Sequence, residues 1–333
     1  ADEFNRPDLL TNVSNNIILP AHANFSAATT SLKQKKDAFI SNPSSVTLDS
    51  LKYAFNAAYL VYMQVETYSF MPSEGIKNLN VFPTDTGQVG TNISTGTYNL
   101  DAANNIRAKG FPAIDYLLFS QDESEVIALF TVDANAANRK QFLNDIINEI
   151  ETVASNASTA WNSYQAQFIS ASGTDIGSSV GMLVNDLSFQ LERCRRERVG
   201  VPLGYIGLIN SGTTVSKSVE AYYSTYSKEL LIENLRNCKV LYTGGSGTGF
   251  DDYLEYLNAA YKDGLLSDTI THQFNIAIQK AQAMPVDFST AVTTNKTEME
   301  SLFIELRKLT VLVKVDMSSQ LGIIINYSDN DGD

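Results

Sequence analysis

Apolar side chains recur every three or four residues over most of the chain, which is the period of a helix with one buried face. Short stripes with this period begin at Leu51, Leu183 and Met299. The longest stripe contains no proline or glycine and consists of Phe142, Ile146, Ile150, Val153, Ala157, Trp161, Tyr164 and Phe168. The pattern predicts an all-α protein of two packed helical bundles. The helix from about residue 139 to residue 168 is expected to be the spine of the second bundle, with Trp161 buried.

Interruptions of the helical pattern suggest how the chain is divided. Pro20 lies inside the first stripe and predicts a kink or a split, because proline lacks a backbone N–H and crowds the preceding turn. Residues 71–100 are rich in Asn, Thr, Gly and Pro and exceed an ordinary helix connection, which predicts a long ordered loop with a functional or interface role. We expect an N-terminal helical bundle over residues 1–134 and a C-terminal helical bundle over residues 135–333.

Composition and charge exclude several classes of protein. The 333 residues are 44% hydrophobic and carry 24 basic and 37 acidic side chains, a net charge of −13. Nucleic-acid binding is not expected, because it requires a basic face. No apolar run approaches the roughly 20 residues of a membrane-spanning helix. Two histidines, His22 and His272, cannot supply a site of three imidazoles. Two cysteines, Cys194 and Cys238, are too few for a disulfide scaffold, and whether they pair stays open.

The segment from Arg107 to Phe119 is the strongest candidate for a ligand site. Gly110 suits a left-handed helix cap, and Pro112 suits the first turn of a following helix. Asp115 is three positions after Pro112, so both lie on one face of that turn, near the positive end of the helix dipole. A capped helix junction with a favourably placed acid explains the same residues without any ligand.

The densest basic run of this acidic chain comprises Arg193, Arg195, Arg196 and Arg198. The run could complement the dipole at a helix C-terminus. Alternatively, Arg195 and Arg198 could face a cleft and bind an anion such as a carboxylate, a phosphate or a chelated iron complex. Glu66, at the end of an earlier helix, is a candidate companion of Asp115.

The candidate segment also resembles a known family signature. Gly110-x-Pro112-x-x-Asp115, followed by Tyr116-Leu117-Leu118-Phe119, is similar to the Gly-x-His-x-x-Glu signature of the imelysin family, also classed as peptidase family M75. Further segments along the chain are similar to the family as well. They include residues 15–20, 66–72, 195–204, 249–254 and 321–333, the last resembling the close of lipoproteins from Bacteroidetes.

The resemblance implies two helical bundles with the signature facing the cleft between them, export, and a link to iron or haem uptake. The location implied is the periplasm or the outer-membrane surface, with a lipid anchor lost before a trimmed N-terminus. The partner implied is an iron- or haem-related ligand or an envelope protein. The signature is degenerate here, because Pro112 replaces His and Asp115 replaces Glu, and proline neither ligates a metal nor moves a proton.

We therefore expect an exported imelysin-like binding protein without peptidase activity and without catalytic residues. An M75-type metallopeptidase and a cell-envelope scaffold for protein interactions remain alternatives. The expected ligand-binding residues are Gly110, Pro112, Asp115, Glu66, Arg107, Arg195 and Arg198.

Asp115 is expected to be partly buried between the bundles and therefore hydrogen-bonded or paired, because a lone buried carboxylate costs several kcal/mol. Arg107 or the arginines from Arg193 to Arg198 could neutralise it and leave metal affinity weak. Clustering with Glu66 or another acid would instead leave a negative pocket for iron or another hard cation. No cofactor is otherwise indicated.

Overall fold

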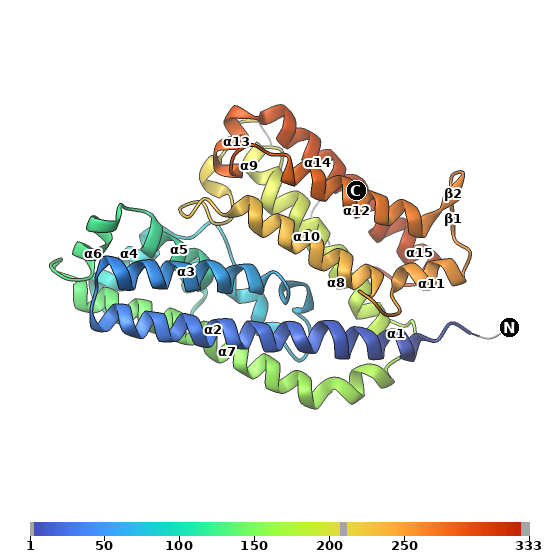
Figure 1. Cartoon of the computed structure of the whole chain (residues 1–333), viewed down its shortest axis with the longest axis horizontal. Helices are drawn as coiled ribbons and strands as arrows, with labels where there is room; N and C mark the ends of the chain where they lie inside the picture. Colours follow the sequence, from blue (N-terminus) through green and yellow to red (C-terminus); the bar gives the residue numbers. More distant parts are fainter. Residues whose placement is uncertain (1–2, 207–211, 328–333) are drawn as a thin grey trace.

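Helices account for nearly all the regular structure of the protein. The computed structural model describes residues 3–206 and 212–327, and its elements run from α1 at the N-terminus to α15 near the C-terminus (Figure 1). Within these ranges the one sheet is a small hairpin of β1 (Ala260–Tyr261) and β2 (Gly264–Leu265). The predicted all-α class is confirmed. No helix among the described residues is long and apolar enough to cross a membrane.

The first helix changes type at its proline. α1 (Arg6–Val13) continues through a π-helical turn, η1 (Ser14–Ile18), into α2 (Leu19–Ser41), with Pro20 in the first turn of α2. Pro20 has no N–H to donate, and widening the preceding turn accommodates this loss and the bulk of its ring. The predicted interruption is thus a change of helix geometry within a continuous helical run. α3 (Ser45–Tyr62) follows after a capping box formed by Ser44 and Thr47.

The long helix α7 (Ala136–Ser170) lies alongside α2 (Figure 1). Its residues from Phe142 to Ala157 belong to one core cluster together with side chains of α2 and α3. Trp161 and Phe168, near its end, belong to the other core cluster. Trp161 is fully buried, as predicted. The expectation that this helix is the spine of the second bundle is wrong, because α7 packs mainly against the N-terminal helices. An apolar stripe requires a packed partner but does not specify which helices provide it. The division at residue 134 stays a prediction.

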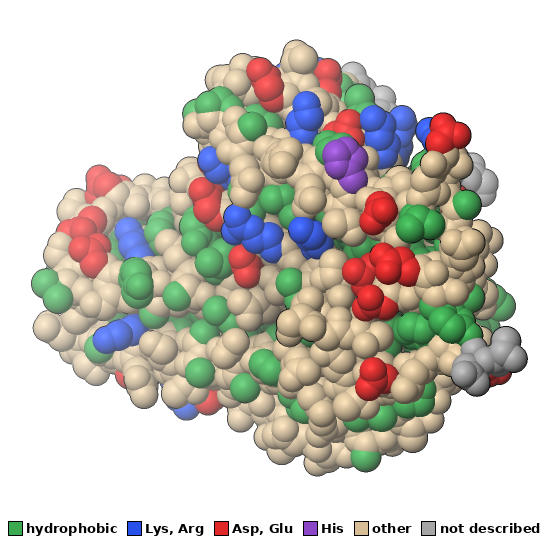
Figure 2. Space-filling view, turned by 45° about the vertical axis from the view of Figure 1, so that its right-hand side comes forward, with side chains coloured by type: hydrophobic (Ala, Val, Ile, Leu, Met, Phe, Trp, Pro, Cys, Tyr) green, Lys and Arg blue, Asp and Glu red, His purple; other side chains and the backbone are tan. Residues whose placement is uncertain are grey.

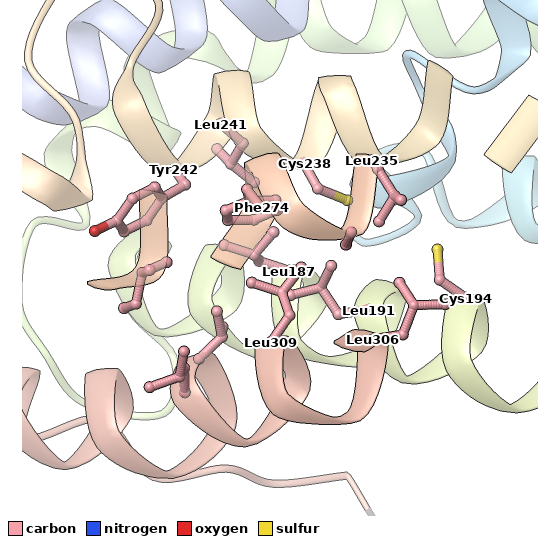
Figure 3. Packing of buried hydrophobic residues seen from close by; sticks show 14 of the residues in the cluster. Leu187, Leu191, Cys194, Leu235, Cys238, Leu241, Tyr242, Phe274, Leu306 and Leu309 are labelled. Carbon is pink, nitrogen blue, oxygen red and sulfur yellow. The ribbon is translucent and has the colours of Figure 1, made fainter. Parts of the chain in front are cut away.

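The second core cluster is surrounded by the helices of the C-terminal half. Leu187, Leu235, Phe274 and Leu306 point toward one another in its interior (Figure 3). The elements of this half are α8 (Ser179–Arg193), η5 (Cys194–Gly200), α9 (Val201–Leu203), η6 (Ser216–Ser218), α10 (Ser227–Thr243), α11 (Phe250–Tyr256), α12 (Leu266–Gln282), α13 (Phe288–Thr294), α14 (Lys296–Val311), η7 (Leu312–Met317) and α15 (Ser318–Leu321). Cys194 and Cys238 are buried here as free thiols, so they do not pair.

The segment expected as a long loop contains short helices of its own. They are η3 (Glu74–Leu79) and α4 (Thr86–Thr95), which pack against α7, and η2 (Glu66–Tyr68) precedes them. The chain then passes through η4 (Ala103–Asn105) into α5 (Gly110–Phe119) and α6 (Glu123–Leu129). This stretch places Glu66, Gly110 and Asp115 on the side of the N-terminal half that faces the C-terminal helices.

Candidate functional site

Gly110 begins α5 in a conformation that only glycine tolerates. Its φ is +69°, and a Cβ at this position would lie 2.2 Å from the carbonyl oxygen of Leu79. The predicted left-handed conformation is confirmed. The residues before it form turns rather than a regular helix, so Gly110 opens α5 and does not close a preceding helix. Pro112 lies in the first turn of α5, as its missing donor allows.

Asp115 is buried and is held by backbone amides. It is 2% exposed, and its two carboxylate oxygens accept hydrogen bonds from the amides of Tyr223 at 2.9 Å and Ser224 at 3.0 Å. Burial raises the pKa of Asp115 to about 6, although these hydrogen bonds oppose the rise. The carboxylate therefore ties α5 to the segment before α10.

Both expected pairings of Asp115 are wrong. Its hydrogen bonds go to backbone amides rather than to an arginine or to a cluster with Glu66. Arg107 is exposed, and its carbonyl oxygen accepts hydrogen bonds from the amide of Asp85 and the hydroxyl of Thr84. Sequence reasoning missed the two amides because the backbone has no signature in the sequence.

The side chain of Glu66 is buried and binds two arginines. Its Oε1 lies 2.6 Å from Nη1 of Arg193, and its Oε2 lies 2.6 Å from Nη2 of Arg198. Burial alone would raise the pKa of Glu66, but the two guanidinium groups outweigh burial and hold the pKa below its usual value. Side-chain amides of Asn80, Gln190 and Asn234 also donate to this carboxylate.

A second buried carboxylate completes the network. Glu220 accepts from Nε of Arg198 at 2.8 Å and from Nη2 of Arg198 at 2.9 Å. Nδ2 of Asn80 donates to Glu220 at 2.6 Å, and the hydroxyl of Tyr59 donates to Asn80. Two carboxylates thus face two guanidinium groups, which satisfies the requirement that buried charges be paired. The sequence offered no sign of Glu220, which lies between helices.

The π-helical segment η5 explains why these arginines converge. A π-helix bonds residue i to residue i+5, so Arg193 at its start and Arg198 share a face. Arg195 lies on another face, where it pairs with Glu192 and packs over the ring of Phe303. Of the two arginines of this run that were expected to bind a ligand, Arg198 therefore belongs to the buried network and Arg195 lies outside it.

Three adjoining cavities form what we call the central groove. The first, of about 280 Å³, is lined by Pro112, Asp115 and Lys217; the second, of about 390 Å³, by Arg107 and Arg193. The third, of about 290 Å³, is lined by Glu66, Asp186 and Arg193. Phe82, Pro83 and Ser218 are common to the first and second cavities, whereas Lys77, Phe189 and Arg193 are common to the second and third.

Three cations of the central groove have no ion-pair partner among the described residues, namely Lys77, Arg107 and Lys217. The acids that line the groove are Asp115, Glu66, Glu197 and Asp186. Glu66 and Glu197 are both bound by Arg193. Burial raises the pKa of Asp186 to about 7, although the charge of Lys77 opposes the rise, so the negative charge near Lys77 is partly lost at neutral pH. The groove is thus more positive than the chain as a whole.

The metal-ligand atoms that the central groove offers do not fit a hard cation. No group of three His, Cys, Asp or Glu side chains suitable for a metal ion occurs in the part of the chain that the structure describes. Pro112 has no ligand atom, and the oxygens of Asp115 and Glu66 already accept hydrogen bonds. The groove offers cationic side chains instead, which match an anion.

The fold and the groove together define an all-α protein with a polar groove between its N-terminal and C-terminal helices. The family model of imelysin, peptidase M75, matches residues 18–312, and the chain belongs to the imelysin family. No curated protein matches the sequence.

Two solved structures share the fold. An iron-regulated protein A precursor from Parabacteroides distasonis ATCC 8503 superposes with a TM-score of 0.77 at 16% identity, over 96% of each chain. An imelysin-like protein from Psychrobacter arcticum 273-4 gives a TM-score of 0.73 at 16% identity, over 97% of each chain. These similarities confirm the imelysin-like fold that the sequence predicted.

Proposed function

We propose that this protein is a binding protein of the imelysin family whose central groove takes a small anionic ligand, and that the ligand is a chelated iron complex. The observation that carries the proposal is the set of three cations along the groove, Lys77, Arg107 and Lys217, that lack an ion-pair partner among the described residues. Cations without a counter-charge along a concave surface attract an anion by a direct Coulomb interaction.

An iron chelate suits this groove better than a bare iron ion. In a chelate, organic acid groups already occupy the metal, and the complex presents carboxylate oxygens and negative charge outward. Arginine and lysine bind such oxygens, whereas a bare ion would need the carboxylates of Asp115 and Glu66, which already accept hydrogen bonds. The iron-regulated protein A precursor with the same fold supports the link to iron.

The same site supports a role without peptidase activity. Pro112 stands where the family signature has His and cannot ligate a metal or transfer a proton, and Asp115 is held by two amides. We further propose that the protein acts outside the cytoplasm, in the periplasm or at the outer-membrane surface, with a lipid anchor.

Titration calorimetry with ferric citrate, citrate alone and ferric chloride tests the proposal. We expect ferric citrate to bind saturably, and the double variant Arg107→Ala/Lys217→Ala to lose at least tenfold in affinity. Lys35→Ala/Arg236→Ala is the matched control, because it removes one lysine and one arginine that are exposed and lie outside the groove. Absence of saturable binding of ferric citrate, or equal losses in the two double variants, would refute the proposal.

A further inference from the structure

A second basic cavity lies away from the central groove, between the β-hairpin and the helices α12 and α14. Its volume is about 420 Å³, within the range of small-molecule sites. Several basic side chains gather on the upper part of the face shown in Figure 2. The cavity is lined by Tyr261, Lys262, Thr269, Gln273, Arg307, Lys308, Val311 and Leu312, and we call it the hairpin cavity.

Among the residues that the structure describes, three cations and no carboxylate line the hairpin cavity. Lys262 comes from the hairpin turn, whereas Arg307 and Lys308 come from α14. Two of the lining residues bind the carboxylate of Glu305, which accepts hydrogen bonds from Lys308 at 3.0 Å and from Gln273 at 2.7 Å. Even with Glu305 and Asp263, the neighbour of Lys262 in the hairpin turn, both counted, three cations face two acids in a chain of net charge −13.

Arg307 and Lys262 are available to a ligand. Arg307 is exposed, and its guanidinium group makes no hydrogen bond or ion pair within residues 3–206 and 212–327. Lys262 packs over the ring of Tyr261 at 5.4 Å, and its backbone has a positive φ of 52° that turns the hairpin. A guanidinium group with its donors free is the usual partner of phosphate and carboxylate oxygens.

The remaining wall of the cavity contains Thr269 and Gln273, and the rest of that wall is apolar. Val311 is 47% exposed although it is aliphatic. Leu312 and Tyr261 line the same cavity. A ligand that covers this wall gains about 0.8 kcal/mol for each methylene group removed from water. The cavity therefore combines an anion-binding rim with an apolar wall.

We propose that the hairpin cavity binds a phosphate ester that carries an apolar chain. The phosphate oxygens contact Arg307, Lys308 and Lys262, and the apolar chain lies along Val311 and Leu312. Phosphate suits this rim because it offers several oxygens to several cations at once. The same chemistry occurs in a soluble alkyl phosphate and in the headgroup of an anionic phospholipid.

Titration calorimetry at low ionic strength with inorganic phosphate and hexyl phosphate tests the proposal, because screening weakens such contacts at high salt. We expect saturable binding of hexyl phosphate at least tenfold tighter than that of phosphate, the gain from burying about two methylene groups. Arg307→Ala/Lys308→Ala is expected to lose at least tenfold in affinity for hexyl phosphate. Both substituted side chains are exposed, and melting curves followed by circular dichroism confirm that the variant is folded.

The groove variant Arg107→Ala/Lys217→Ala is the matched control and should bind hexyl phosphate within twofold of the unmodified protein. No saturable binding of hexyl phosphate, or an unchanged affinity in Arg307→Ala/Lys308→Ala, overturns the proposal. An equal loss in the groove variant also overturns it, because the ligand would then be in the central groove.

Two further measurements identify the source of the phosphate ester. Tighter binding of monomeric dihexanoyl phosphatidylglycerol than of hexyl phosphate, with co-sedimentation on phosphatidylglycerol vesicles, assigns the cavity to a lipid headgroup. Binding of hexyl phosphate without co-sedimentation assigns it to a soluble phosphate ester. The ferric citrate experiment addresses other residues, so either proposal can fail without the other.

Discussion

Glu66 and Arg198 are 132 positions apart in the sequence, yet their side chains form a buried ion pair of 2.6 Å. Glu66 ends up in η2, after the first helices, and Arg198 is in the π-helical segment η5. The pair therefore joins the N-terminal helices to the C-terminal helices at the wall of the central groove.

We expect Arg198→Met to destabilise the protein by about 3–5 kcal/mol, because it leaves Glu66 and Glu220 with too few partners in the interior. Urea denaturation measures the free energy of unfolding. Lys35→Met is the matched control, since Lys35 is exposed, and it should change stability by less than about 0.5 kcal/mol. Similar values for the two variants would show that the network is not a major source of stability.

Gly110→Ala should destabilise the protein, because the added Cβ would meet the Leu79 carbonyl oxygen at 2.2 Å and the backbone has a positive φ. A loss above about 1 kcal/mol is expected. Gly90→Ala is the control: Gly90 lies inside α4, and a Cβ there would meet nothing within 4 Å. This substitution should stabilise the protein by about 0.5–1 kcal/mol. Thermal melting distinguishes the two, and a stabilising Gly110→Ala would contradict the geometry.

His22 should make the protein less stable in acid. Both ring nitrogens are buried without a hydrogen-bond partner, and burial lowers the pKa of His22 to about 4 from its ordinary value of 6.5. The unfolded state therefore binds the proton first as pH falls. The stability that the neutral ring allows is complete above pH 6.5 and declines toward pH 4, by about 3 kcal/mol.

The variant His22→Leu should lack this contribution, so its unfolding free energy relative to that of the unmodified protein should rise by about 3 kcal/mol from pH 6.5 to pH 4, measured by urea denaturation at several pH values. The pair of acids with raised pKa values, Asp115 at about 6 and Asp186 at about 7, acts in the opposite sense, since its contribution is lost as pH rises. Its effect is common to both proteins and cancels in the comparison. His272→Leu, at an exposed position, should keep the slope of the unmodified protein. An unchanged slope in His22→Leu would contradict the prediction.

Purified protein should not cleave insulin chains above background, with or without added Zn²⁺, Mn²⁺ or Fe²⁺, because Pro112 provides neither a ligand nor a proton carrier. Mass spectrometry of the reaction products measures this. Metal-dependent cleavage that disappears in Asp115→Ala, while circular dichroism shows the variant still folded, would establish a peptidase instead.

The periodicity of the sequence was a reliable guide to local structure. It predicted the helical class and the burial of Trp161, because a stripe of apolar residues needs a packed partner whatever that partner is. For the same reason the periodicity could not say which partner: the stripe on α7 packs mostly on α2, although the sequence places it in the second bundle. Gly110 was recognised because its conformation is a local property.

The site was less predictable than the helices. The sequence identifies Asp115, but its partners are the backbone amides of Tyr223 and Ser224. Backbone amides occur at almost every position of any chain, so no residue type marks these two. Glu220 lies in a stretch without helical period, so the sequence did not predict its position. It accepts a hydrogen bond from Arg198, which lies in a π-helical segment that no residue pattern predicted. Such contacts depend on how distant segments are brought together, and that arrangement is set by the packing of the whole chain.

α7 contributes side chains to both core clusters, and the helical run from α1 to α2 does so as well, with Leu9 in one cluster and Phe25 in the other. Two long helical segments, α7 and the run from α1 to α2, therefore extend from one half of the molecule into the other. A hinge motion that opened the central groove would have to bend both of them. We expect ligands to enter by movements of side chains and short connections at the rim, with the two halves unfolding as a single cooperative unit.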